Sequence, residues 1–479
     1  MSRYDAIIVG SGPNGLAAAI TLQQQGLSTL LIEGDEQIGG GMRTKELTLP
    51  GFKHDVCSAI HPMAMASPFF NSLPLAAHGL EFVLPRYAAA HPLDNGATAF
   101  LHNNLSDTVD GLGVDGQRYK RLIEPLMTNW ESLSKDIMGP LRFPDKPLNL
   151  AAFGLHALQP ASWIARRFQT QQGAALWAGM AAHGIQPLSN WTTSAIALVL
   201  SAVGNKYGWP VPIGGSQAIA NALLSYYQSL GGELQTGNWI DDIATLPSHK
   251  VLILDMTPKQ LLQLKGCTFS KSYTRQLQQF RQGMGVFKID WALSEKTPFR
   301  DLRCQEAATV HLGNTYAEIA ENERASHLGK KVKKPFVLFT QQSAFDDQRA
   351  PAGKHTGWAY CHVPNGSPED YTQEIEKQIE RFAPGFRDTI LARHTYSPAQ
   401  LEAYNPNYIG GDINGGIMDI FQLYTRPVRS LTPYRTSLKQ VYICSSSTPP
   451  GGGVHGMSGY HAAKTALKDH WGIVDAVGL

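Results

Sequence analysis

The sequence is poor in cysteine, and its cysteines are isolated from one another. Five occur in 479 residues, and no two of them form a CxxC pair. This pattern argues against a redox-active dithiol and against a structural zinc site. It suits a reducing compartment, where disulfides are rare. We therefore expect a cytoplasmic protein with no bound metal.

Charge and long apolar runs are also scarce. Charged residues make up 17% of the chain and the formal net charge is only +2. The densest basic run, Lys330–Lys334, stops at Pro335 and is interpreted as a solvated loop. Nucleic acid is therefore not an expected partner. No stretch reaches the roughly 18 apolar residues of a membrane-spanning helix, so we expect a soluble protein that can also lie on a membrane surface.

What the chain does have, at its very start, is an apolar run followed by a glycine-rich loop. Asp5–Val9 is typical of a buried parallel strand, and Gly10–Gly15 follows directly. Leu16–Gln25 is rich in residues that favour a helix, and Ser28–Glu33 predicts a second strand. This order of strand, glycine loop, helix and strand, with an acid at its end, predicts a dinucleotide-binding unit.

The residues of the loop have separate physical roles. Gly10 permits a tight turn, Gly12 lets the backbone approach a pyrophosphate, and Gly15 lets the helix pack closely on the strand. The helix start offers unpaired N–H groups and a partial positive charge to the phosphates. The cofactor-binding residues predicted here are Gly10, Gly12, Pro13, Asn14 and Gly15.

A second glycine cluster follows the acid. The Glu33 carboxylate can accept two hydrogen bonds from an adenosine ribose. Gly39, Gly40 and Gly41 add backbone N–H groups near the pyrophosphate, and Arg43 adds a charged donor. Nicotinamide enzymes do not normally need this cluster, so the sequence favours FAD as the cofactor.

The motif E-x5-G-G after a Rossmann fingerprint, here Glu33 followed by Gly39 and Gly40, resembles the amine-oxidase and phytoene-desaturase superfamily of flavoproteins, whose FAD lies extended across the first domain. Pro212–Gln217 is similar to the P-x-G-G turn of that superfamily, which leads back into the FAD domain. Thr448–Gly456 resembles its G-T-x-P-G-G-G-x-x-G loop, which places a helix at the N1–C2=O edge of the flavin. The resemblance implies cofactor contacts from Gly452, Gly453 and Val454.

Other segments resemble the branch of pyridine nucleotide-disulfide oxidoreductase domain proteins, which is related to phytoene desaturase and retinol saturase. The resemblance implies an α/β fold: a Rossmann-type, glutathione-reductase-like FAD-binding domain interleaved with a substrate domain of mixed sheet and helices. We assign residues 1–65, 205–275 and 405–479 to the FAD-binding domain, and residues 66–204 and 276–404 to the substrate-binding or lid domain. The segments that carry this resemblance are Cys57–Pro62, Pro351–His355 and Asn405–Gly416.

The function that this resemblance implies is FAD-dependent dehydrogenation of a long, largely apolar polyene- or lipid-like substrate. The electron acceptor stays open, with oxygen, a quinone or another carrier as candidates. Three alternatives stay open. They are a redox-neutral flavin-dependent isomerase, an amine oxidase, and a non-catalytic prenyl or lipid carrier, since the Rab GDP dissociation inhibitors share this fold. Such a carrier does not need both the pyrophosphate glycines and Glu33.

Two histidines are the catalytic candidates. His455 lies inside the C-terminal glycine loop and His61 lies shortly after the first glycine region. A packed, hydrogen-bonded histidine is the competing interpretation for each. Tyr207 and Trp209 are candidates for a pocket wall, and Arg426 is either a cation near the cofactor or a member of a surface ion pair.

Overall fold

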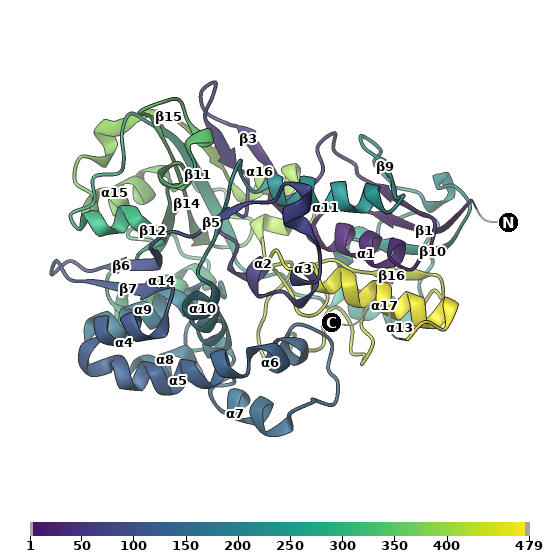
Figure 1. The fold of residues 1–479 in the computed structure, drawn as a ribbon, viewed down its shortest axis with the longest axis horizontal. Helices are drawn as coiled ribbons and strands as arrows, with labels where there is room; N and C mark the ends of the chain where they lie inside the picture. Colours follow the sequence, from purple (N-terminus) through teal and green to yellow (C-terminus); the bar gives the residue numbers. More distant parts are fainter. Residues whose placement is uncertain (1–2, 475–479) are drawn as a thin grey trace.

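The structure is a computed structural model that describes residues 3–474, and it has two lobes, each built on its own sheet (Figure 1). The first lobe contains a five-stranded parallel sheet of order β16-β10-β1-β2-β9. Its strands are β1 (Tyr4–Val9), β2 (Thr29–Ile32), β9 (Glu233–Gln235), β10 (His249–Leu254) and β16 (Val441–Ile443).

Helices cover both faces of this sheet, which explains why β1, β2, β10 and β16 are largely continuous apolar runs rather than alternating ones. One face packs against α1 (Pro13–Gln23), α11 (Gln217–Ser229) and α17 (Met457–Trp471). The other packs against α12 (Pro258–Leu261) and α13 (Lys271–Gln278). α17 begins directly after the loop at Thr448–Gly456.

The second lobe is built on a seven-stranded sheet of order β15-β11-β14-β13-β12-β6-β7. The sheet is mixed, because β12 and β6 run parallel while its other neighbours run antiparallel. Its strands are β6 (Tyr87–Pro92), β7 (Thr98–His102), β11 (Gly285–Leu293), β12 (Ala307–Leu312), β13 (Val337–Thr340), β14 (His355–Val363) and β15 (Ile390–Tyr396).

The seven-stranded sheet presents two different faces. One face buries a tight apolar cluster against α15 (Thr372–Phe382). Side chains of the other face, among them Leu338 and Tyr360, belong to the large cluster that also contains residues of the first lobe. Side chains alternate between the two faces along each strand, so every second residue of a strand faces the first lobe.

A layer of helices completes the second lobe below this sheet in Figure 1. It accounts for the unusually apolar stretches of the first half of the sequence, since α9 and α10 are buried along most of their length. The helices are α4 (Leu105–Gly111), α5 (Gly116–Thr128), α6 (Trp130–Ile137), α7 (Pro147–Ala157), α8 (Ala161–Ala165), α9 (Gln171–Ala182), α10 (Thr193–Tyr207) and α14 (Tyr316–His327).

Short elements join the lobes. They are the hairpin of β3 (Thr44–Glu46) and β4 (Lys53–Asp55), the pair of β5 (Phe82–Val83) and β8 (Val211–Pro212), and the helices α2 (Pro62–Ala66), α3 (Pro68–Asn71) and α16 (Pro398–Tyr404).

The strands of the two sheets come from the chain ranges that the sequence assigns to separate domains, so the lobes alternate along the chain. The mixed α/β architecture predicted from the sequence is confirmed, and the residue boundaries between the domains stay a prediction. Within residues 3–474, none of the helices combines the length and the apolar character needed to cross a bilayer.

Candidate functional site

A cavity of about 480 Å³ has walls from both lobes. At one end it is lined by the glycine loop after β1 and by the acid after β2. In the middle it is lined by segments 57–62 and 403–414. At the far end its wall comes from α10 and from β12, β13 and β14 of the second lobe. The cavity therefore runs from the predicted cofactor loop into the predicted substrate domain.

The glycine loop is shaped as the sequence predicts. Gly10 has φ +100°, a conformation that side chains other than that of glycine rarely adopt. Gly12 is the N-cap of α1 and has no side chain to cap the helix, and in the first turn the Gly15 N–H is bonded to the Asp255 side chain. A Cβ atom on Gly15 would lie 1.8 Å from the Gly10 carbonyl oxygen, so only glycine allows α1 to start this close to β1.

The acid after β2 is held in place by neighbours on the loop. The Glu33 carboxylate accepts hydrogen bonds from the Ser11 N–H at 2.9 Å and the Ser11 hydroxyl at 2.5 Å. Arg43 Nη2 lies 3.2 Å from Glu33 Oε1, and Arg43 Nη1 lies 3.4 Å from Asp35. Arg43 is buried and stacks over the Tyr404 ring at 5.4 Å. In this structure Arg43 therefore positions Glu33, besides lining the cavity.

The second glycine cluster closes over the first. Gly40 and Gly41 line the cavity, and a Cβ on Gly40 would lie 3.1 Å from the Gly12 Cα. Gly39 is not part of the wall; its N–H donates to the Ser11 carbonyl oxygen at 3.2 Å and its φ is +112°. The two glycine segments thus form one cradle of backbone around the start of α1.

Sequence reasoning missed a carboxyl group at this cradle. Asp255 follows β10 directly and is buried, and its Oδ2 accepts a hydrogen bond from the Gly15 N–H at 3.2 Å. A Cβ on Gly12 would lie 2.8 Å from the same oxygen. Burial raises the pKa of Asp255 to about 7, and the nearby charge of Glu33 adds to the increase. The available signal was its position at the carboxyl end of a strand beside β1.

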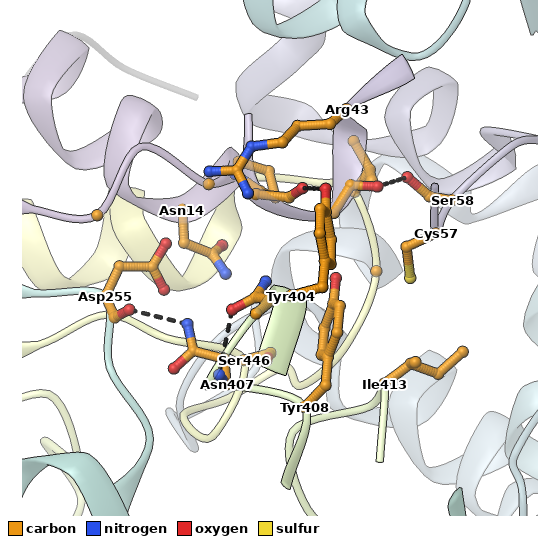
Figure 2. A pocket seen from close by; sticks show the side chains of 18 of the residues that line it. Asn14, Arg43, Cys57, Ser58, Asp255, Tyr404, Asn407, Tyr408, Ile413 and Ser446 are labelled. Carbon is orange, nitrogen blue, oxygen red and sulfur yellow. Dashed lines mark hydrogen bonds between the residues drawn. The ribbon is translucent and has the colours of Figure 1, made fainter. Parts of the chain in front are cut away.

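Two tyrosines stand along the middle of the cavity. Figure 2 shows Tyr404 and Tyr408 pointing toward the segment that carries Arg43 and Cys57. The Tyr404 hydroxyl donates to the Gly40 carbonyl oxygen at 3.0 Å. Burial raises the pKa of the Cys57 thiol, so this residue stays protonated. Asp255 and Asn407 lie on the other side in Figure 2, joined by a 3.0 Å hydrogen bond from Asn407 Nδ2 to the Asp255 carbonyl oxygen.

The C-terminal glycine loop forms the next part of the wall. Gly453 and Val454 line the cavity, and Gly453 has φ +126°. Gly452 lies behind them, where a Cβ would come within 2.9 Å of the Asn414 Cα. The loop leads directly into α17, as the resemblance implies.

Both catalytic candidates lie outside the wall that the described residues form. His455 Nδ1 accepts a hydrogen bond from the Met457 N–H at 3.0 Å, and its Nε2 lies 3.2 Å from the Gly451 carbonyl oxygen. His61 Nε2 is hydrogen-bonded to the Ser216 hydroxyl at 2.8 Å. Burial lowers the pKa of each to about 4. This geometry favours packed, neutral imidazoles, and catalytic roles for them stay a prediction that no contact supports.

The outcomes for Trp209 and Arg426 differ. Trp209 lines the cavity, as the sequence suggests. The alternative of a surface ion pair for Arg426 is wrong, because the side chain is completely buried. Its Nη2 donates to the carbonyl oxygens of Gly415 and Ser446, so it clamps the loops beneath the glycine segment.

Comparisons with known proteins agree with the dinucleotide-binding geometry of the cradle. Residues 8–72, which contain both glycine clusters, match the family model of an NAD(P)-binding Rossmann-like domain. The chain is 25% identical to the mouse pyridine nucleotide-disulfide oxidoreductase domain-containing protein 2, over 98% of this chain and 94% of the relative. It is 21% identical to the lycopene-forming phytoene desaturase of Pseudescherichia vulneris, over 96% of this chain and 98% of the relative.

A solved structure shares the whole fold. An oxidoreductase from Methanosarcina mazei superposes with a TM-score of 0.64 at 14% identity, and the match covers 97% of this chain and 99% of that one. Sequence motifs, relatives and architecture therefore agree. Over nearly its whole length the chain is similar to pyridine nucleotide-disulfide oxidoreductase domain-containing proteins and to phytoene desaturases, and it has the fold of a flavin-type oxidoreductase.

Proposed function

We propose that the protein is an FAD-dependent dehydrogenase of a long, largely apolar, lipid- or polyene-like molecule. One observation carries the proposal: a single cavity connects the dinucleotide cradle to a wall of large apolar side chains in the second lobe. The phytoene desaturase relative is named for such a substrate, which supports the same assignment.

The cradle fits FAD. The N-cap residue Gly12 has no side chain to cap the helix, and the buried Oδ1 of Asn14 has no hydrogen-bond partner among the described residues. Backbone N–H groups there suit a pyrophosphate, and Glu33 suits the adenosine ribose. FAD supplies the capacity to accept a hydride from a C–H bond. The protein then has to orient the substrate and exclude water.

The far wall suits an apolar molecule. Leu200, Trp209, Leu338 and Trp358 line it, and all four are buried. Such a wall removes apolar substrate surface from water, which provides most of the binding free energy for a lipid-like ligand. Oxygen or a quinone is the proposed electron acceptor, since the sequence contains one well-formed dinucleotide fingerprint and it is assigned to FAD.

Anaerobic titration of the purified protein tests this function. We expect bound FAD and loss of its visible absorbance on addition of an oxidisable lipid-like compound, whereas micromolar NADH or NADPH leaves the absorbance unchanged. Turnover without net flavin reduction would instead indicate an isomerase. A protein that binds lipid but no flavin would indicate a carrier.

The cofactor assignment has a separate test at Glu33. Replacing Glu33 by Ala removes charged hydrogen bonds worth about 1.5–3 kcal/mol, so FAD should bind roughly ten- to a hundredfold more weakly. Glu46→Ala, an exposed acid on β3, is the matched control and should leave FAD binding unchanged. Full flavin occupancy of Glu33→Ala after dilution would show that Glu33 is not the ribose ligand.

We also propose that the second lobe docks on an anionic lipid surface. Phe143, Leu148 and Leu155, in and just before α7, are 87%, 84% and 71% exposed. α7 lies at the lower edge of the molecule in Figure 1. Lys146, at the start of the same helix, supplies positive charge that complements anionic headgroups.

The aromatic residues next to α7 extend this surface. Trp163 and Trp191 are half-exposed, and their rings pack 5.1 Å apart. The rest of α8 is buried, so α7 is the helix that we propose to lie at the lipid surface. α10 begins at Thr193, two residues after Trp191, and carries Leu200 into the cavity wall. We propose that a lipid-borne substrate enters the cavity from this side.

Liposome flotation with and without anionic lipid measures the docking. We expect flotation with anionic lipid, and its loss in the double variant Phe143→Ser/Leu148→Ser. Leu302→Ser changes an exposed leucine elsewhere and is the control that should keep binding. Absence of flotation of the wild type with either lipid would refute the docking proposal and leave the proposed reaction untouched.

A further inference from the structure

Three polar side chains interrupt the apolar wall at the far end of the cavity. They are His183, Thr309 and Tyr360, and all three line it. His183 follows α9, Thr309 lies in β12 and Tyr360 lies in β14. We refer to these three residues as the polar cluster.

The register of the seven-stranded sheet brings two members of the polar cluster to one face. Leu338 of β13 pairs with Tyr360 on one side and with His311 of β12 on the other. Their side chains therefore project from the same face of the sheet, and Thr309, two residues before His311, shares that face. This is the face whose Leu338 lines the cavity.

Neither hydroxyl of the polar cluster is satisfied by the protein. In the described part of the chain, the Thr309 and Tyr360 hydroxyls have no hydrogen-bond partner, although the two residues are only 4% and 9% exposed. Both residues line the cavity, so a ligand oxygen there can supply the missing partner.

His183 also has a ring nitrogen that can hydrogen-bond a ligand oxygen. Its Nε2 lies 3.0 Å from Nε2 of His311, so one ring donates and the other accepts. Burial lowers the pKa of His183 to about 3 and that of His311 well below its usual value, so both rings are neutral. The bond to His311 and a perpendicular contact with Trp209 at 5.4 Å fix the ring. Its Nδ1 makes no hydrogen bond to residues 3–474 and is left for a ligand.

We propose that the polar cluster binds one hydroxyl or carbonyl oxygen of the substrate. This inference rests on the proposed function, because it concerns the molecule that enters the same cavity. It defines the substrate more narrowly, as a largely apolar compound with an oxygen function at the end that enters the second lobe. A site that hydrogen-bonds such a group discriminates against an analogue without it, because its own buried polar groups would be left unpaired.

A matched pair of ten-carbon probes tests the cluster on the flavin-loaded protein. Carvone is the ketone and limonene the corresponding hydrocarbon, and titration calorimetry measures their dissociation constants without turnover. In the double variant Thr309→Val/Tyr360→Phe we expect the dissociation constant of carvone to rise at least tenfold. That of limonene should change less than twofold. His183→Leu should weaken carvone binding in the same selective way.

The controls distinguish oxygen recognition from a general change of the cavity wall and from the proposed dehydrogenase function. Leu200→Met alters the same wall without an oxygen contact, so it should shift both probes by a similar factor. The two near-isosteric substitutions keep the wall filled, and unchanged melting temperatures would confirm their folding. Equal shifts for both probes in the double variant, or no carvone binding to the wild type at millimolar concentration, would overturn the proposal. Selective carvone binding without flavin reduction by any lipid-like compound would sustain the cluster and refute the dehydrogenase assignment.

Discussion

Asp255 places a carboxyl group at the start of α1, next to the Gly15 N–H. A pyrophosphate bound there is expected to meet N–H groups, not a second negative charge. Burial of Asp255 disfavours the charged form, and the hydrogen bond from Gly15 only partly compensates, so its pKa lies at about 7. A bound pyrophosphate adds negative charge and raises this pKa further. The carboxyl group must therefore be protonated when the cofactor is bound at neutral pH.

This linkage predicts that FAD binds more weakly as the pH rises. Below pH 7 Asp255 is already neutral in the free protein, whereas above pH 7 binding requires the uptake of a proton. The dissociation constant should rise by up to about tenfold per pH unit above the pKa. Fluorescence titration of FAD from pH 6 to pH 9 measures the slope. Asp255→Asn, which is neutral at every pH, should bind FAD with a flat profile, and equal slopes for the two proteins would contradict the prediction.

The residues that sequence analysis found and those that it missed differ in how their positions are determined. Gly10, Gly12 and Glu33 belong to one short stretch, so spacing along the chain is enough to place them together. His183 and Tyr360 meet only because a helix end and a strand from distant parts of the chain converge on one cavity. No local pattern in the sequence encodes that convergence.

Among the elements, α1 and α17 make the contact that shapes the cradle. A Cβ on Gly459 of α17 would lie 1.8 Å from the Asn14 carbonyl oxygen, a backbone atom at the start of α1. The absence of a side chain at Gly459 thus lets the C-terminal helix support the phosphate loop from behind.

Two glycine-to-alanine substitutions compare this contact with an open one. Gly459→Ala should lower the free energy of unfolding by about 1–3 kcal/mol through overpacking, and it should weaken FAD binding because α1 is displaced. Gly154→Ala, inside α7 with no atom within 4 Å of its new Cβ, should raise stability by up to about 1 kcal/mol. Denaturant unfolding and FAD titration measure both effects. A stable Gly459→Ala protein with normal FAD affinity would argue against this support.

Elements were easier to predict than their pairing. Apolar runs and glycine boundaries place β1, α1 and β2 to within a few residues, because local sequence determines where such elements begin and end. The order of the seven-stranded sheet, with β6 and β12 paired in parallel, has no local signature. It is a consequence of tertiary packing.

For the molecule as a whole, buried neutral histidines should determine the response to acid. Six have a pKa of about 3 or 4 instead of 6.5, because burial disfavours the imidazolium ion. Between pH 6.5 and pH 4 the unfolded chain binds protons at these sites and the folded protein does not, so stability falls as the pH falls. The six are His54, His61, His91, His183, His455 and His461.

Two buried carboxyl groups act in the opposite direction. The pKa of Asp255 is raised to about 7 and that of Asp290 to about 6, so each favours the folded protein as the pH falls toward 4. Six histidines outweigh two aspartates, and we expect the melting temperature to fall steeply below about pH 6.5. Scanning calorimetry between pH 7.5 and pH 4.5 measures this. A melting temperature that is constant from pH 6.5 to pH 5 would show that burial of the imidazoles does not limit stability.

The five-stranded sheet has a consequence for how the protein is made. β10 lies between β1, near the start of the chain, and β16, which begins at Val441. At about 5–20 residues per second, β16 is synthesised roughly 9–37 s after β10. During that interval β10 has one unpaired edge and α1 lacks the support of α17. We therefore expect the nascent chain to depend on chaperones and to acquire its flavin only after translation has ended.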